Sequence, residues 1–269
     1  FVLDLAGHNA ILPEYVEKLH VDPESKGEFR YDAFLYKKVK TSGSVSINTM
    51  AFGNNVFGNG VGAFVLEDEP YLRELGVVGV VGGALFRNVV LTIDSRRKKI
   101  TTTVPYRPTY MKLDHRADMA VLPGSAVSLP MTLDGVTIPL IFDTWNEGMI
   151  ALTSSDFSKL GGQAGGAGWL YNGYSKPAVA MNVKNVGKCD FVKNSFTEVI
   201  VTENDELSHS VVGTGILKEG IISIDYQKQK VYFQPFDLVE IKDDVQVGET
   251  VTVEAGKLNP ITRDYFLEH

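Results

Sequence analysis

The sequence has little cysteine, little basic charge and no long apolar run, and each scarcity excludes a class of protein. Cys189 is the single cysteine in 269 residues, which excludes an intrachain disulfide framework and a cysteine-rich metal site. The net charge is −7 at pH 7, whereas non-specific nucleic-acid binding requires a basic surface. No apolar run reaches the roughly 18 residues that indicate a membrane span. We therefore expect neither a nucleic-acid partner nor a membrane-spanning segment.

The remaining composition is that of a globular protein. Hydrophobic residues make up 44% of the chain and charged residues 22%, and 269 residues can bury one large core or two medium ones. Phe1 begins inside an apolar run, so we expect further residues before it. Residues 267–269 (Leu-Glu-His) resemble the start of a C-terminal expression tag and are left out of functional reasoning.

An internal repeat organises the chain. Residues 79–102 (GVVGGALFRNVVLTIDSRRKKITT) align without a gap with residues 210–233 (SVVGTGILKEGIISIDYQKQKVYF). Both blocks contain Val-Val-Gly, an apolar run that ends in Ile-Asp, a polar turn and a last apolar segment. Gly82 aligns with Gly213, an offset of 131 residues. We expect two copies of one unit, followed by an extension. The first repeat, the linker, the second repeat and the extension are residues 1–106, 107–124, 125–236 and 237–266.

Local patterns predict an all-β fold with a few short helices. Short runs rich in β-branched and aromatic residues, bounded by turn residues, indicate strands. These runs are residues 89–94, 98–104, 127–133, 136–142, 221–225 and 230–236. Helices are expected at residues 13–21, 69–75 and 154–160, the last with Ser154 or Ser155 as its N-cap. Alternating strands and helices of a parallel sheet are not indicated.

One aspartate stands at the end of an apolar strand in each copy. Asp4 occurs in Val-Leu-Asp-Leu-Ala, and Asp143 occurs 139 residues later in Ile-Phe-Asp-Thr-Trp. A short polar turn and a second apolar run follow each one. Taken alone, each aspartate is most simply a turn former that accepts hydrogen bonds from nearby backbone amides. The repeat suggests instead that the two aspartates share a role.

Two copies of strand, aspartate turn, strand and Val-Val-Gly resemble the retropepsin-like aspartic peptidases, in the bacterial single-chain form with two repeats. The resemblance implies two barrel-like lobes related by a pseudo-twofold axis, with Asp4 and Asp143 meeting in the cleft between them. It implies that Gly82 and Gly213 support the two turns and that the Thr144 hydroxyl braces the opposite turn. It further implies a peptide or protein as substrate or ligand, no cofactor or metal, and a periplasmic or secreted location. The oligomeric state stays open.

The chemistry of this family explains why two aspartates are needed. Two carboxylates held close together cannot both ionise, so one keeps a proton and its pKa rises. The ionised carboxylate activates a water molecule while the protonated one polarises a peptide carbonyl. The titration then belongs to the pair and not to either residue alone.

Both turns depart from the family motif Asp-Thr-Gly. The first turn has Leu5 and Ala6 after its aspartate, and the second has Thr144 and Trp145. Leu5 cannot make the reciprocal brace, and Trp145 places a large ring where the family has no side chain. Three interpretations stay open. The chain is a working peptidase, or a pseudopeptidase that binds a peptide or other ligand in the cleft, or a structural module whose cleft Trp145 fills.

A flap that closes over the cleft is expected between each aspartate turn and its Val-Val-Gly segment. The candidates are residues 41–55 and residues 161–177. In the second, Trp169, Tyr171 and Tyr174 are possible ligand contacts, since aromatic rings supply large contact areas. The alternative is a surface loop whose aromatic side chains pack against the barrel.

Overall fold

The computed structural model describes residues 1–18, 22–26, 40–52, 56–67, 69–162, 164–166, 169–170, 178–179 and 182–238. Tyr171, Tyr174 and the sequence from residue 239 onward, with nearly all of the expected extension and the tag-like ending, lie outside these ranges. Within the described residues, no helix is both long and apolar enough to cross a membrane.

The fold is all-β with three short α-helices in the described part of the chain, which confirms the predicted class. The helices are α1 (Glu14–Lys18), α2 (Pro70–Glu74) and α3 (Ser154–Lys159). The predicted N-cap of α3 was wrong by one or two residues. Thr153 caps this helix, because its hydroxyl accepts a hydrogen bond from the Asp156 amide at 3.3 Å.

The first sheet has six strands in the order β1-β6-β2-β5-β4-β3. Their bounds are β1 Val2–Leu3, β2 Ala10–Ile11, β3 Asp22–Lys26, β4 Thr41–Phe52, β5 Val56–Leu66 and β6 Gly79–Val81. β1 runs parallel to β6, β2 runs antiparallel to β6, and β2 runs parallel to β5. The Val-Val pair of β6 therefore lies between the strands that precede and follow Asp4.

The second sheet has seven strands in the order β10-β11-β12-β18-β13-β17-β16. Their bounds are β10 Ala120–Val121, β11 Val127–Leu133, β12 Val136–Phe142, β13 Ile150–Leu152, β16 Val183–Phe191, β17 Asn194–Glu203 and β18 Val211–Val212. β12 runs parallel to β18, β13 antiparallel to β18, and β13 parallel to β17. The connections around Asp143 thus repeat those around Asp4.

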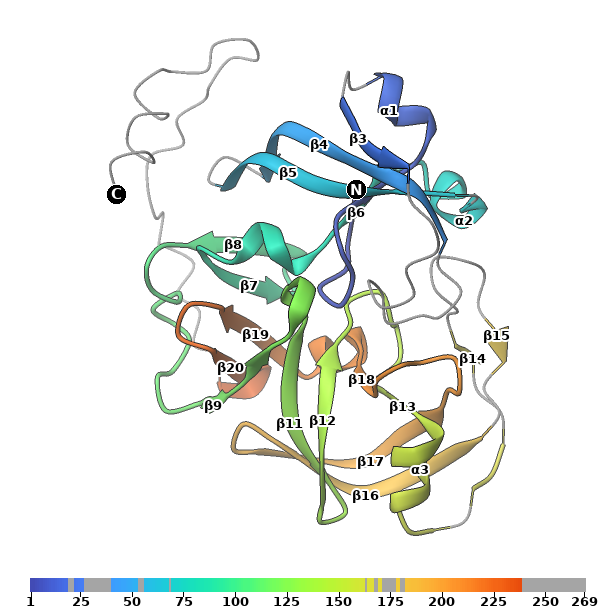
Figure 1. Ribbon diagram of the computed structural model, residues 1–269. Helices are drawn as coiled ribbons and strands as arrows, with labels where there is room; N and C mark the ends of the chain where they lie inside the picture. Colours follow the sequence, from blue (N-terminus) through green and yellow to red (C-terminus); the bar gives the residue numbers. More distant parts are fainter. Residues whose placement is uncertain are drawn as a thin grey trace. The chain divides into compact units, whose positions relative to one another are not determined.

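A five-stranded sheet joins the two halves of the sequence, in the order β8-β7-β19-β20-β9. Its strands are β7 Val90–Asp94, β8 Lys99–Thr103, β9 Arg116–Asp118, β19 Gly220–Asp225 and β20 Lys230–Pro235. Figure 1 shows β7 beside β19, and the two strands pair antiparallel. Thr92 stands opposite Ser223, with their hydroxyl oxygens 2.6 Å apart. These two residues occupy equivalent places in the repeat, 131 residues apart.

The described residues also include a small strand pair and several 3₁₀ helices, among them Pro123–Ser125 and Phe236–Leu238. A two-stranded pair is formed by β14 (Trp169–Leu170) and β15 (Ala178–Val179). Short 3₁₀ helices follow β6 at Gly83–Phe86 and β18 at Thr214–Lys218. Each therefore follows its Val-Val-Gly segment directly, as the sequence repeat requires.

Candidate active site

Asp4 is held in a tight turn at the end of β1. Its amide donates to the Val81 carbonyl at 2.9 Å, which continues the pairing of β1 with β6. Its carboxylate Oδ1 accepts hydrogen bonds from the amides of Ala6 and Gly7, each at 3.0 Å. The residue is 3% exposed. The carboxylate thus has a fixed orientation inside the turn, because it bonds to the backbone of that turn.

Asp143 is held in the corresponding way at the end of β12. Its amide donates to the Val212 carbonyl at 2.9 Å, and its Oδ1 accepts from the Trp145 amide at 2.8 Å. The residue is fully buried. A buried carboxylate in each turn is costly to the fold unless it is hydrogen-bonded, and both carboxylates are.

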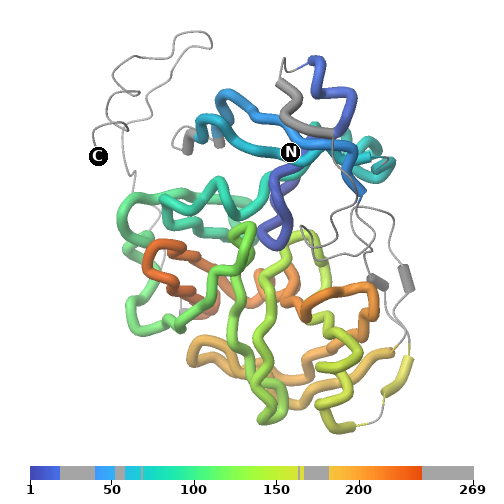
Figure 2. Tube along the Cα trace, in the orientation of Figure 1, coloured from blue at the N-terminus to red at the C-terminus, as the bar shows by residue number. Residues whose placement is uncertain are grey.

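The Thr144 hydroxyl joins the two turns. It donates to the Leu3 carbonyl at 2.7 Å and accepts from the Leu5 amide at 3.0 Å. Asp4 lies between these two contact residues, and Asp143 directly precedes Thr144. The aspartates are therefore next to the point where the turns touch. Figure 2 shows the dark blue N-terminal loop reaching the green chain of the second half.

Leu5 gives this junction an asymmetric form. Its side chain is fully buried in the hydrophobic core and carries no hydroxyl, so it cannot return the two hydrogen bonds that Thr144 makes. The junction is instead supported by apolar packing on the side of the first turn. Burial of a leucine side chain contributes roughly 1.5–3 kcal/mol to folding.

Gly82 and Gly213 lie tightly against the two turns. A Cβ on Gly82 would overlap the carbonyl oxygen of Gly7, and a Cβ on Gly213 would overlap the carbonyl oxygens of Asn146 and Gly148. These contacts involve backbone atoms, which cannot move aside as a flexible side chain can. Only glycine fits at either position.

Sequence reasoning missed Asn9, which ties the first turn to Gly82. The Asn9 side chain accepts from the Gly82 amide at 2.9 Å and donates to the Gly62 carbonyl at 3.4 Å. It is nearly buried. The signal available in the sequence was an amide side chain five residues after Asp4, which is weak because asparagine is common in turns.

Trp145 is half-buried and packs against α2. Its ring lies 5.8 Å from the Tyr71 ring in an edge-to-face arrangement. The two rings line a cavity of about 390 Å³, together with Leu3, Leu75 and Thr144 among others. Tyr71 is a second residue that sequence reasoning missed, because the helix that carries it lies 74 positions before Trp145 in the sequence. Neither aspartate lines this cavity.

Among the described residues, no contact connects the other predicted cleft residues with the junction that Thr144 forms between the two turns. Trp169 stands in β14, where its backbone pairs with Val179. Within the first flap candidate, residues 41–52 form β4, which pairs with β5 along its length as part of the six-stranded sheet.

Three further observations concern chemical groups outside the aspartate turns. Cys189 is buried, and this burial raises the pKa of its thiol to about 12, so it is protonated and a poor nucleophile at neutral pH. The described residues contain no group of three His, Cys, Asp or Glu side chains that fits a metal ion. Asp118, near the middle of the sequence, forms an ion pair with Lys230.

Comparison with solved structures finds many similar chains. No family model matches the chain, and no curated protein matches it. Among solved structures, the chain is similar to a crystal structure of a retropepsin-like aspartic protease from Rickettsia conorii, with 19% sequence identity and a TM-score of 0.34. The similarity covers 44% of this chain and 89% of that chain. The function proposed below rests on the contacts of this chain itself.

Proposed function

We propose that this protein is an aspartic peptidase homologue of the retropepsin-like, two-repeat kind, which hydrolyses peptide bonds with Asp4 and Asp143 as its paired carboxylates. Support comes first from the topology. The strands around each aspartate have the same parallel and antiparallel neighbours in the six-stranded and seven-stranded sheets. The pairing of equivalent residues Thr92 and Ser223 is what a pseudo-twofold axis between two lobes would produce.

The observation that carries the proposal is the pair of hydrogen bonds made by Thr144. One hydroxyl bonds to the residue before Asp4 and the residue after it, which supports a shared junction of Asp143 and Asp4. Neighbouring carboxylates share a proton, because like charges at short range cannot both ionise. The ionised member takes a proton from water as the water attacks the peptide carbonyl, and the protonated member donates a hydrogen bond to the carbonyl oxygen.

Cleavage of a complex peptide library between pH 3 and 7, read by mass spectrometry, tests this function. Asp143→Asn and Asp4→Asn should each abolish the cleavage seen with the parent protein, because each change removes the shared proton with little change of shape. Asp118→Asn is the matched control, since Asp118 is exposed and belongs to β9, the end strand of the five-stranded sheet. The aspartate turns follow strands of the six-stranded and seven-stranded sheets. Folded parent protein that cleaves no peptide at any pH would contradict the proposal.

A second candidate function is binding of a peptide without hydrolysis, and the packing of Trp145 on Tyr71 favours it. The indole occupies the position after Thr144, where a working site needs room for the substrate backbone to approach. Trp145→Gly distinguishes the two candidates. If the ring blocks the substrate, this variant gains cleavage that the parent lacks. If the parent already cleaves, the variant should lose stability and gain no activity.

A further inference from the structure

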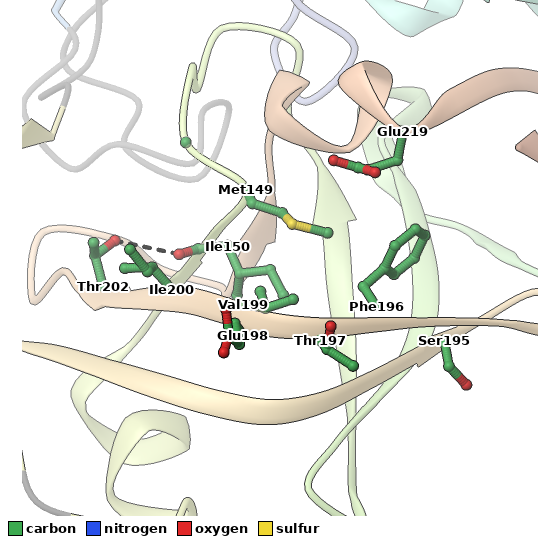
Figure 3. Close-up of a pocket in the computed structure, with 11 residues that line it drawn as sticks. Met149, Ile150, Ser195, Phe196, Thr197, Glu198, Val199, Ile200, Thr202 and Glu219 are labelled. Carbon is green, nitrogen blue, oxygen red and sulfur yellow. Dashed lines mark hydrogen bonds between the residues drawn. The ribbon is translucent and has the colours of Figure 1, made fainter. Parts of the chain in front are cut away.

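A cavity that neither aspartate lines lies against β17. Its volume is about 570 Å³, within the range of about 300–1,000 Å³ that ligand sites occupy. One wall is the continuous segment Ser195–Ile200, and the other is formed by Gly148–Ile150 and Glu219. Figure 3 shows the Met149 side chain and the Phe196 ring lying between these walls.

The cavity meets the edge of β17 and not one of its faces. Side chains alternate between the two faces of a strand, so a cavity on one face would be lined by every second residue. Six consecutive residues, from Ser195 to Ile200, line this one. Only the edge, where the backbone amides and carbonyls point outward, gives all six access to the same space.

This edge has no strand partner among the described residues. β17 pairs with β16 between Asn194 and Thr202 on one side, with an interruption at Glu198, whose φ is 56°. On its other side β13 pairs only with Val201–Glu203, because β13 begins at Ile150 and the chain before it leads back toward Asp143. A half-paired strand exposes every second amide and carbonyl as a template for another extended segment.

The cavity has an apolar floor and two acidic groups. Phe196 packs on Phe233 with ring centroids 5.7 Å apart, and Ile200 is 59% exposed. Glu198 and Glu219 line opposite walls, and neither carboxylate forms an ion pair with another described residue. An occupant with alternating apolar and cationic side chains would complement both features.

We propose that the open edge of β17 binds an extended, basic peptide segment, which adds to the sheet as a strand beside residues 195–200. Main-chain hydrogen bonds supply the affinity and the two glutamates select for lysine or arginine. Six residues of strand span roughly 20 Å, so a segment of six to eight residues fills the site. The site is independent of the peptidase reaction, because neither Asp4 nor Asp143 lines it.

Fluorescence anisotropy with three labelled octapeptides tests the proposal. The probe is four Val-Lys repeats, and the comparison peptides are four Val-Glu repeats and a Val-Lys peptide N-methylated at alternate residues. The Val-Lys probe should bind, and both comparison peptides should bind at least tenfold more weakly. Glu198→Gln and Glu219→Gln should each weaken binding of the Val-Lys probe about two- to fivefold, as expected for exposed charge pairs. Glu17→Gln, an exposed glutamate on α1, is the matched control and should change nothing.

Three results would overturn this assignment. The first is equal binding of the Val-Lys and Val-Glu peptides. The second is unchanged binding when Glu198 and Glu219 are both replaced. The third is a dimer, measured by sedimentation, that dissociates on Ile200→Lys, because a second copy of the chain would then occupy the edge. Mass spectrometry of the recovered probe keeps binding separate from cleavage. A peptidase that lacks this site would cleave the probe without the charge-dependent binding. A protein that has the site but no activity would bind the probe and leave it intact.

Discussion

At the scale of single residues, the two aspartate turns are unequal partners. Thr144 contributes two hydrogen bonds across the junction, at 2.7 and 3.0 Å, while Leu5 contributes only buried apolar surface. The two turns therefore differ in their contacts. Leu5 packs in the core where Thr144 forms hydrogen bonds, and Trp145 packs on Tyr71.

Thr144→Val should weaken the junction. The change keeps the shape of the side chain but leaves the Leu5 amide and the Leu3 carbonyl without the hydroxyl. The loss of unfolding free energy should be about 1–3 kcal/mol, since a half-buried donor and acceptor lose their partner. Urea denaturation measures this loss. Thr144→Ser restores the hydroxyl and should recover most of it. Equal stability of the valine and serine variants would mean that the hydroxyl contributes nothing.

Gly213→Ala should destabilise the fold by about 1–3 kcal/mol, because the new methyl group would overlap two backbone carbonyls of the second turn. Gly161→Ala is the matched control, as a Cβ there meets nothing within 4 Å. Thermal unfolding of both variants gives the comparison. If the two substitutions have the same effect, the close approach of Gly213 to Asn146 is not needed for stability.

At the scale of elements, the sequence predicted those parts whose cause is local. The runs at 127–133 and 136–142 became β11 and β12 with these same bounds, because β-branched residues and a turn at Asp134-Gly135 favour a hairpin. The three helices were also predicted, since each has a compact apolar pattern. The strand β4 falls within the first flap candidate, which was placed by its position between the aspartate turn and the Val-Val-Gly segment, and its role as a flap stays a prediction.

The features that the sequence did not predict depend on contacts between residues that are far apart in the chain. Tyr71 meets Trp145 only because α2 and the second turn are brought together by the fold. Residues 195–200 of β17 have one strand neighbour among the described residues, because β13 begins at Ile150. The residues of a strand do not by themselves specify which strands lie beside it. The internal repeat predicts a link between Asp4 and Asp143 across the chain, because two copies of one unit imply a common geometry. That link stays a prediction.

Lys184 stabilises the end of α3 through hydrogen bonds, although lysine is usually a surface residue. Its ammonium group is nearly buried and donates to the carbonyls of Phe157 and Leu160 at the end of α3, at 2.9 and 2.7 Å. Lys184→Met should therefore fray the last turn of α3 and cost about 1–3 kcal/mol. Hydrogen exchange of the α3 amides checks this. Lys188→Met, at an exposed lysine, is the control and should change stability by no more than about 0.5 kcal/mol. Unchanged exchange in α3 would contradict the role.

At the scale of the whole molecule, the five-stranded sheet couples both halves of the sequence. β7 and β19 pair through four residues each, so neither repeat completes this sheet alone. Both tryptophans, Trp145 and Trp169, belong to the second half, and Trp145 also packs on Tyr71 of the first half. Their fluorescence therefore reports on the second half and on that contact. Circular dichroism reports on the β-structure of both halves.

The two signals should follow one cooperative urea transition. Leu91→Ala, a fully buried position in the first half opposite Ile224, should lower the midpoint of the tryptophan fluorescence as well, with a loss of about 2–5 kcal/mol. Measuring both signals on the parent and on this variant makes the comparison. If Leu91→Ala left the urea midpoint of the fluorescence transition unchanged, the two halves would fold independently.

The central claim is that Asp4 and Asp143 act as one pair, and their linked titration tests it most directly. Carbon-13 NMR of the aspartate carboxyl carbons would be recorded from pH 2 to 8 for the parent, Asp4→Asn and Asp143→Asn proteins. The pairing predicts that the two carboxyls of the parent titrate in two coupled steps. The remaining carboxyl of either variant should titrate in a single step at a different pH, because the neighbouring carboxyl is gone. An Asp143 titration that is the same with and without Asp4 would contradict the pair, whatever the protein cleaves or binds.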